Sequence, residues 1–342
     1  MYQVSSQQPD FMILKLYKQY GFTVWLLLAV GLAIVWPQPA ASGGFLCADV
    51  TTKIGVWGIF LIQGLSLPTD ELRAGFSPKR LHVFVLCWNY LFFPLLTALI
   101  LIFFGGLMGP ELRLGFCLLA IMPTTVASAI ACTALAGGNT ANAIFSTVYS
   151  NVLAIWLVPL IAVAYLATEM ATHVALWPLF AKLGLLILLP LVIGQSVRRV
   201  EPVRSAYLAA RSRWLGQGII LFIVHAAFAE SVGSGALDSL SASAMCIVLA
   251  VVALLLLSVS WIAWMTAALL HVDYSQRISA FFCATQKSLA SGLPLAASVL
   301  AAAGGVINDA RILIPLICYH PLQLMLAGVV SERLRVKGPD KV

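Results

Sequence analysis

Length, composition and charge already restrict the class of protein. The chain has 342 residues, of which 61% are hydrophobic and only 10% are charged, whereas soluble domains carry about 25% charged residues. This composition excludes an ordinary soluble domain and predicts an all-α polytopic membrane protein. The seven cysteines stand singly without a C-x-x-C pair, so they predict neither a disulfide framework nor a zinc site.

Apolar runs long enough to cross a bilayer recur along the whole sequence. The first run follows a polar start that lacks the basic residues of a signal peptide, so we expect it to be retained. Ten spans are predicted, at about 21–37, 52–67, 81–106, 113–135, 140–168, 175–197, 214–232, 241–270, 277–301 and 311–330.

The positions of the basic residues orient these spans. Of the 20 lysines and arginines, one falls inside the ninth span and four fall on the outer side, namely Lys53, Arg113, Lys182 and Arg311. The others lie on the side of both termini, which predicts cytoplasmic termini in a cell inner (plasma) membrane. The basic segments, of which 198–213 is the longest, then meet anionic membrane lipid. The net charge of +7 therefore requires no nucleic-acid partner.

The ninth predicted span holds a lysine, Lys287, in its polar stretch 281–294. An unpaired ammonium in the hydrocarbon core costs at least ~2.5–3.5 kcal/mol, so such a lysine usually faces a polar interior and has a function. Snorkelling to the membrane surface is the alternative. However, Lys287 lies about ten residues past Arg277, roughly 15 Å along a helix and near the middle of the bilayer.

Polar and helix-breaking residues surround this lysine. Gly292 and Pro294 follow it, and proline removes a backbone donor, so the helix is predicted to kink or open there. Freed carbonyls beside polar side chains at membrane depth are typical of solute sites in carriers. The predicted contacts of the solute or ion are Thr285, Gln286, Lys287, Ser288 and Ser291.

The fourth predicted span resembles the ninth. Residues 124–129 align with 287–292, and a Gly-Gly pair follows each segment, at 137–138 and at 304–305. Each segment is the fourth span in a set of five, and five is odd, so the second set enters the membrane inverted. Inverted repeats with broken polar helices at matching places indicate a secondary transporter. We predict repeats at 1–168 and 169–342, and Thr124, Thr125 and Ser128 join the candidate site.

Further polar residues inside the spans fit the same plan. For each of them alone, the alternative is a hydrogen bond between helices worth about 0.6–2 kcal/mol. Glu230 can also lie at the outer membrane interface. The remaining residues of this kind are Asn89, Thr147, Ser150, Asn151, His225, His320 and Gln323.

Several segments carry a family resemblance. The main ones are F-L-I-Q-G-L-S-L at 60–67, P-T-T-V-A-S-A-I at 123–130, A-G-G-N-T-A-N-A-I at 136–144, F-C-A-T-Q-K-S-L-A-S-G-L-P at 282–294 and Y-H-P-L-Q at 319–323. They resemble the bile acid:sodium symporter superfamily, solute carrier family 10, and in it the branch of bacterial symporters related to the vertebrate member-7 carrier. The similarity extends over nearly the whole chain.

The resemblance implies a fold with ten spans in two inverted five-helix repeats. A panel domain would contain the spans at about 21–67 and 175–232, and a core domain those at about 81–168 and 241–330. In the core, spans four and nine would unwind and cross. The solute site would then lie between panel and core at that crossing, with alternating access produced by rocking of one domain against the other.

The resemblance also implies sodium ligands, which carry over only in part. By position, Ser128, Thr147 and Gln286 match a serine, a threonine and a glutamine ligand, and Asn89 stands where a glutamine is expected. A second asparagine and a second serine of the family site are alanines here, Ala129 and Ala143.

The largest departures concern charge. The key glutamate of the family is Phe282 here, and Lys287 replaces the asparagine next to Gln286. Two unit positive charges ~4 Å apart repel by about 4 kcal/mol at an effective dielectric constant of 20. We therefore hypothesise that Lys287 occupies one cation site. Alternatively it faces the cavity and pairs with an anionic solute. A buried amine can also release its proton, so Na⁺ and H⁺ are both candidate coupling ions.

The leading prediction of function is secondary transport of a small organic, anionic solute. The alternative is a binding or regulatory membrane protein on the same scaffold, without net transport. An enzyme is not predicted, because intramembrane hydrolysis and lipid-phosphate chemistry need paired or clustered acidic residues. The aspartates are instead isolated at predicted loops and span edges, as at Asp49, Asp238, Asp273 and Asp309. Apart from a coupling ion, no cofactor is predicted.

Overall fold

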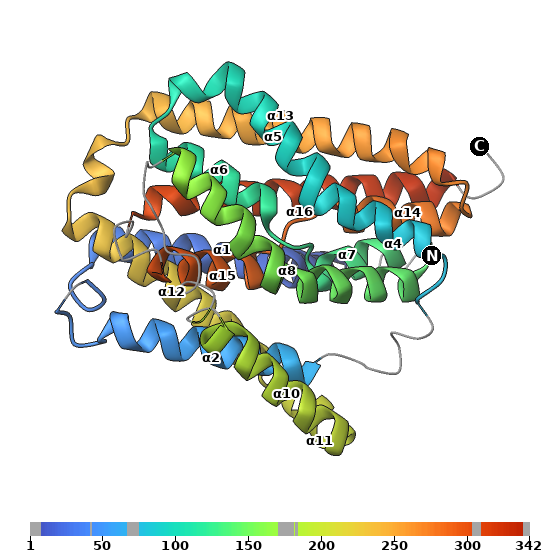
Figure 1. Ribbon diagram of the computed structural model, residues 1–342, viewed down its shortest axis with the longest axis horizontal. Coiled ribbons are helices and arrows are strands. Elements are labelled where there is room, and N and C mark those ends of the chain that lie inside the picture. Colours follow the sequence, from blue (N-terminus) through green and yellow to red (C-terminus); the bar gives the residue numbers. More distant parts are fainter. Residues whose placement is uncertain are drawn as a thin grey trace, which may run out of the picture.

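The computed structural model describes residues 8–41, 43–66, 75–169, 181, 184–302 and 309–337. All regular elements of these residues are helices (Figure 1). In chain order they are α1 Gln8–Val35, α2 Ala48–Ser66, α4 Lys79–Cys87, η1 Trp88–Phe92, α5 Phe93–Phe104, η2 Gly105–Leu107, α6 Pro110–Ile121, α7 Val126–Leu135, α8 Thr140–Glu169, η3 Gly184–Leu188, α10 Leu189–Val200, α11 Pro202–Arg211, α12 Arg213–Gly233, η4 Ala236–Ser239, α13 Ala242–Ala267, η5 Ala268–Leu270, α14 Tyr274–Thr285, α15 Leu289–Ala302, η6 Ala310–Leu313 and α16 Ile314–Lys337.

Several segments of the described chain are long and apolar enough to cross a membrane. Four are continuous helical segments, Lys79–Leu107, Trp214–Gly233, Ala242–Leu270 and Ala310–Arg335. Two more are bent pairs, α6 with α7 and the two parts of α8. Shorter apolar stretches lie in α1 and α2. The prediction of an all-α membrane protein with several spans, some of them broken, is thereby confirmed.

This result does not establish how many spans the chain has, so the predicted number of ten spans stays a prediction. Residues 175–180 and 182–183 of the sixth predicted span lie outside the described residues, as does the Gly304-Gly305 pair. The ninth predicted span is divided into α14 and α15 by a non-helical break at 286–288.

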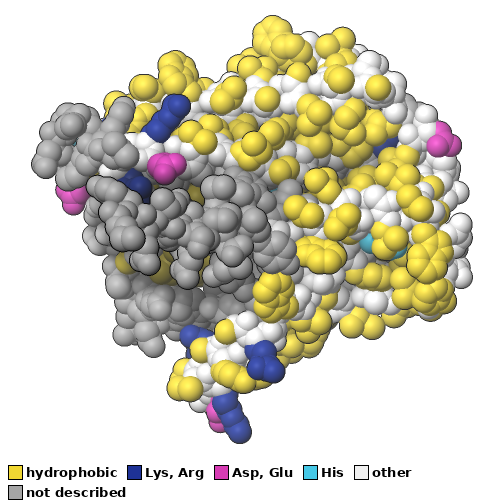
Figure 2. All heavy atoms as spheres, turned by 180° about the vertical axis from the view of Figure 1, so that it is seen from behind, with side chains coloured by type: hydrophobic (Ala, Val, Ile, Leu, Met, Phe, Trp, Pro, Cys, Tyr) yellow, Lys and Arg dark blue, Asp and Glu magenta, His cyan; other side chains and the backbone are white. Residues whose placement is uncertain are grey.

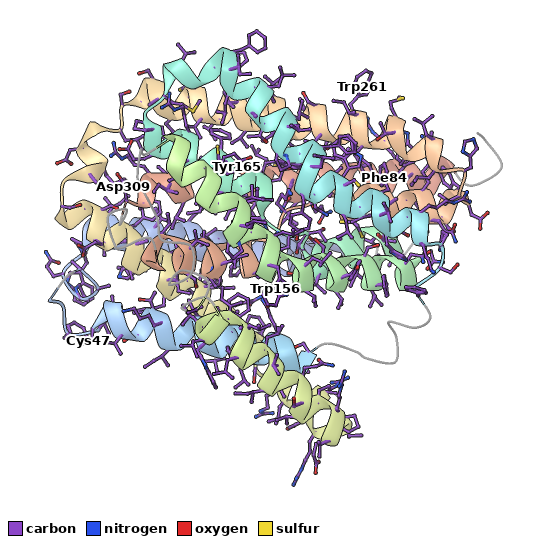
Figure 3. The ribbon with its side chains drawn as sticks, in the orientation of Figure 1. Cys47, Phe84, Trp156, Tyr165, Trp261 and Asp309 are labelled. Carbon is purple, nitrogen blue, oxygen red and sulfur yellow. The ribbon has the colours of Figure 1, made fainter. Side chains whose placement is uncertain are left out.

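Apolar side chains cover much of the outer surface of the helices. Ile102 of α5 is 76% exposed and Trp261 of α13 is 68% exposed. Figure 2 shows hydrophobic side chains over much of the described part of one face, and Figure 3 shows Trp261 pointing away from the bundle. Such a surface is stable in lipid, where apolar side chains carry no hydration cost.

The helices pack in two groups. In the first, α2 packs against α10 and α12, and α12 packs against α1. In the second, α13 packs against α5, α14 and α16, while α8 packs against α4, α6, α7 and α14. Helix α15 contacts α2 and α12 of the first group and α8 and α16 of the second. It therefore lies at the junction of the two groups (Figure 1).

Small residues bring α2 and α10 into backbone contact. A Cβ atom on Gly194 of α10 would collide with the carbonyl oxygen of Leu61, and one on Gly64 of α2 with that of Leu191. Close approach through small residues is how helices associate in lipid, where burial of apolar surface gives little driving force. These two glycines therefore determine how α2 and α10 pack.

Replacing Gly194 with alanine is expected to lower the free energy of unfolding by about 1–3 kcal/mol, because the added methyl group forces the two backbones apart. Thermal unfolding of the purified protein in detergent measures this effect. The matched control is Gly216→Ala in α12, where no atom lies within 4 Å of the new Cβ. Equal melting temperatures for the two variants would contradict the close contact.

Candidate functional site

Two helix breaks lie against each other in the middle of the described bundle. The first, at 122–125, separates α6 from α7, which are bent by 57° relative to each other. The second, at 286–288, separates α14 from α15. The Ser288 backbone N–H donates to Pro123 O at 2.8 Å, and the Ser128 hydroxyl donates to Gln286 Oε1. The polar parts of the fourth and ninth predicted spans are therefore in direct contact.

Lys287 lies at this contact and is fully buried. Its ammonium also lies over the Phe93 ring, 4.1 Å from the ring centroid. The oxygens that accept from Lys287 Nζ are Ala120 O at 2.8 Å, Met122 O at 2.9 Å, Asn89 O at 3.1 Å and Asn89 Oδ1 at 3.3 Å. Four oxygens and an aromatic face thus surround one positive charge, which is the environment that a bound metal cation would need.

The carbonyl of Asn89 is available because of a proline five residues later. Asn89 lies in η1, a π-helical turn in which the Phe93 N–H donates to Trp88 O, five residues back. The equivalent partner of Asn89 O would be the backbone nitrogen of Pro94, which carries no hydrogen. The carbonyl therefore accepts from Lys287 instead. The Asn89 side-chain amide donates to Val85 O and Cys283 O, which directs its oxygen towards the ammonium.

The other two carbonyls belong to the C-terminal end of α6. The last carbonyls of a helix have no partner within the helix, and Pro123 in the break provides no N–H to replace them. The Thr124 N–H turns away and donates to Ser150 Oγ at 3.4 Å. The negative end of a helix dipole also favours a cation by about 0.3–2 kcal/mol. Ala120 and Met122 therefore offer both free oxygens and a favourable electrostatic field.

Helix α16 holds the backbone of Lys287 through one side chain. The Lys287 N–H donates to Gln323 Oε1 at 2.7 Å, and Gln323 Nε2 donates to Lys287 O at 2.7 Å. The same nitrogen lies 3.0 Å from His320 Nδ1, so this histidine nitrogen is the acceptor. Tyr319 donates to Thr285 O at 2.9 Å. Side chains from two adjacent turns of α16 therefore hold the backbone at and just before the break between α14 and α15.

The start of α15 is capped within the site. Ser288 Oγ accepts from the Ser291 N–H at 3.1 Å and from the Ser291 hydroxyl at 2.7 Å. On the other break, the Asn151 amide donates to Thr124 O at 2.8 Å. The Thr124 hydroxyl is buried without a hydrogen-bond partner among the described residues. An unpaired hydroxyl beside two helix starts is a group to which a solute can bind.

The predicted site residues therefore fall into two classes. Hydrogen bonds bring Lys287 and its neighbours together with Asn89, Ser128, His320 and Gln323, whereas Thr124 bonds to Ser150 and Asn151 and follows Pro123, which accepts from Ser288. Thr147 is different, because its hydroxyl donates to Ile144 O at 3.0 Å within its own helix. Thr125 is nearly buried at the start of α7. Ala120, Met122 and Phe93, which surround the Lys287 ammonium, are not predicted as site residues from the sequence. The one sequence signal for the π turn is Pro94, five residues after Asn89.

The residues that the resemblance assigns to sodium do not fit a bound sodium ion in this arrangement. Asn89 Oδ1 already accepts from the Lys287 ammonium. Gln286 Oε1 accepts from Ser128, whereas the Thr147 hydroxyl donates to Ile144 O and keeps its oxygen lone pairs. A fixed positive charge stands among these oxygens, and the position of the family's glutamate is apolar. A bound sodium ion at this place would therefore lie next to the ammonium without a compensating carboxylate.

A separate cleft of about 470 Å³ lies between the two helix groups. One wall comes from the α1–α2 connection, α2 and α12, and the other from α15 and from η6 with its N-cap Asp309. Its polar lining includes Lys53, Glu230, Ser298 and Asp309. Figure 3 shows two of its lining residues, Cys47 and Asp309, at the same end of the molecule. The cleft therefore opens at the end where α1 connects to α2.

An apolar helical bundle with several spans, in which two broken helices meet around a buried cation and polar groups, has the features of a membrane transporter. Comparison of the sequence with protein families agrees with this class. The chain belongs to the SBF-like CPA transporter family, whose model matches residues 20–336. It is therefore a multi-pass membrane protein of a transporter family, which agrees with the prediction that it is not an enzyme.

Two relatives are similar over nearly their full length. "Uncharacterized protein PA2026" of Pseudomonas aeruginosa is 32% identical over 326 residues, which are 94% of either chain. "Sodium/bile acid cotransporter 7" of the mouse is 28% identical over 323 residues, which are 92% of either chain. The resemblance to the bile acid:sodium symporter superfamily, and to its member-7 branch, is thereby confirmed.

Replacing Gln323 with alanine is expected to destabilise the protein by about 2–6 kcal/mol, because both backbone groups of Lys287 lose their partner in a buried site and each costs about 1–3 kcal/mol. Thermal unfolding in detergent measures the change. Gln217→Ala, at a half-buried position of α12, is the control and is expected to shift stability by no more than about 0.5 kcal/mol. A similar small shift in both variants would disprove the holding role of Gln323.

Proposed function

We propose that the protein is a secondary transporter, a carrier of a small organic anion, in which the Lys287 ammonium takes the place of a sodium ion at the site, so that any active uptake would have to be coupled to protons. Transport occurs by alternating access, with the two contacting helix breaks at the solute site. The observation that carries the proposal is the fully buried ammonium held by four oxygens from η1 and the end of α6. A tethered cation there provides the positive charge without binding an ion from solution.

Electrostatics supports the replacement of sodium. A second cation ~4 Å from the ammonium would be repelled by about 4 kcal/mol at an effective dielectric constant of 20, which corresponds to a nearly thousandfold loss of affinity. A family member with this lysine is therefore expected to function without sodium. Proton coupling through the same amine is the alternative, and it would appear as uptake driven by a pH gradient.

The preference for an anion follows from the helix ends at the site. Helices α7 and α15 both begin at the contacting breaks, at Val126 and Leu289. The N-terminal end of a helix attracts negative charge through its free N–H groups and its dipole. Lys287 adds a full positive charge behind them. The hydroxyls of Thr124, Ser288 and Ser291 provide the polar contacts that would orient the solute.

The proposed architecture is that of ten spans in two inverted repeats, 1–168 and 169–342. In this arrangement, the group of α1, α2, α10 and α12 is the panel, and the second packing group is the core. The cleft between α2, α12 and α15 supports an access path on the side that the basic residues predict to be extracellular. Both termini would then be cytoplasmic.

Binding of the proposed solute class is tested by thermal stabilisation of the purified protein with a panel of small mono- and dicarboxylates, in sodium chloride and in choline chloride. We expect at least one compound to stabilise the protein equally in both salts, by about 2.7 kcal/mol at one hundred times its Kd. The Lys287→Met variant should lose this shift. Lys79→Met, which removes an exposed lysine at the start of α4, should keep it.

Transport of the stabilising compound is then measured in proteoliposomes, because flux distinguishes a carrier from a binding or regulatory protein on the same scaffold. Uptake is expected to be unchanged when choline replaces sodium and to be abolished in Lys287→Met. Binding without any flux would favour the regulatory protein instead. Uptake that stops on removal of sodium would contradict the tethered-cation proposal.

Sodium binding itself tests the role of the lysine. In wild-type protein we expect the melting temperature to be the same in sodium chloride and in choline chloride, because the ammonium excludes a second cation. The Lys287→Asn variant restores the residue that the resemblance implies, and sodium should stabilise it specifically. Stabilisation of the wild type by sodium to the same extent as the variant would disprove the proposal.

A further inference from the structure

Helix α11 presents an unusual surface. It is a ten-residue helix, Pro202–Arg211, that follows α10 after a single residue. Only Ser205 and Ala209 are buried, and α11 packs against α2 and α10. Val203 is 82% exposed and Tyr207 is 62% exposed. In Figure 1 the helix lies at the far end of α10, away from most of the bundle, so the rest of its surface faces lipid or water.

The side chains of α11 are ordered by helical spacing. Val203 and Tyr207 are four residues apart and share one face, while Arg204 and Arg211 are seven apart and form a row beside it. This double stripe lies opposite the buried Ser205 and Ala209. Arginine can place its hydrocarbon stem along an apolar surface while its guanidinium reaches a polar layer. The pattern is therefore that of a helix lying in the plane of a membrane surface.

The depth of α11 follows from the helix after it. Trp214 is 73% exposed and is the first residue of the candidate span Trp214–Gly233, three residues after the end of α11. Tryptophan and tyrosine are enriched at the boundary between hydrocarbon and headgroups. Because Trp214 marks this boundary, α11 lies at the level of the lipid headgroups.

The local charge is strongly positive. The segment 198–211 contains four arginines and a single acidic residue, Glu201. The arginines are Arg198, Arg199, Arg204 and Arg211. The pair of Arg204 and Glu201 is 3.9 Å apart and exposed, so it contributes little and leaves the guanidinium free to bind elsewhere. Figure 2 shows lysine and arginine side chains gathered at the end where α11 lies. An anionic partner with a phosphate group fits this surface.

Contacts also connect this surface to the helices beneath it. Arg198 Nη1 donates to Leu65 O at 3.3 Å, at the end of α2. Further along the same pair, Gly64 and Gly194 hold α2 and α10 in backbone contact. Helix α11 itself packs against both of these helices, so whatever holds α11 also acts on α2 and α10.

We propose that α11 is an interfacial helix that binds the headgroups of anionic phospholipids through Arg204 and Arg211, with Val203 and Tyr207 inserted among the acyl chains. The lipid holds α2 and α10 at a fixed depth in the bilayer. Each basic residue near an anionic membrane surface strengthens binding roughly fivefold, so the two arginines together contribute about thirtyfold.

The test is hydrogen exchange of the full-length protein in nanodiscs of phosphatidylcholine with and without phosphatidylglycerol. We expect peptides covering 202–211 to exchange at least threefold more slowly when phosphatidylglycerol is present. High salt should reduce this protection, because it screens exposed charges. The double variant Arg204→Gln with Arg211→Gln should lose it while keeping the melting temperature of the wild type, since both side chains are exposed.

The control removes equal charge elsewhere, by Arg333→Gln with Arg335→Gln near the end of α16, where both side chains are exposed. This variant should retain the lipid-dependent protection of 202–211. Equal exchange in both lipid compositions would overturn the proposal. The same protection by inorganic phosphate in phosphatidylcholine nanodiscs would also overturn it, because the ligand would then be a soluble anion and not a lipid.

Discussion

The arrangement around Lys287 depends on one constraint, which is that a positive charge removed from water must be surrounded by oxygen atoms. Transfer of an ammonium into a medium of low dielectric constant costs several kcal/mol even after the protein relaxes. A regular helix has no oxygens to offer, because its carbonyls accept from its own N–H groups. The chain meets the constraint with three local irregularities: the π turn at Asn89, the end of α6, and the break at Lys287 itself.

These irregularities depend on one another. If α6 continued as a helix through Pro123, its last carbonyls would no longer face the ammonium, and the contact of Pro123 O with the Ser288 N–H would be lost. If the lysine were absent, the oxygens of Asn89, Ala120 and Met122 would need another cation. In relatives with a carboxylate and no lysine, a dissolved cation could fill that place. Here the cation at this place is the Lys287 ammonium, which is part of the chain and in the proposed carrier would not leave with the solute.

Much of this site could be predicted from the sequence, because its signals are rare residues. A lysine in a long apolar run is conspicuous, and so are Asn89 and Gln323 on other spans. The oxygens of Ala120 and Met122 could not be predicted, since every residue has a carbonyl and only the local backbone decides whether it is free. Thr147 matches a ligand by position, and its hydroxyl donates to Ile144 O within α8, so its role as an ion ligand stays a prediction. For 198–213, charge indicated lipid contact, but the helical order of the side chains emerged only with α11.

The two membrane-related features lie on different helix groups. Lys287 and its oxygen ligands belong to the group around α13 and α16, whereas α11 extends α2 and α10. In a carrier that works by relative movement of two bodies, one body must be held by the membrane for the other to move the solute across it. An interfacial helix on α2 and α10 would hold that group.

The buried ammonium would then move with the other group, and its charge would cross part of the membrane's electric field. Each elementary charge that traverses the full field changes the free energy by about 2.3 kcal/mol per 100 mV. In the proposed carrier, a tethered cation would make the movement of the empty protein sensitive to voltage, and an anionic solute bound beside it would cancel that sensitivity.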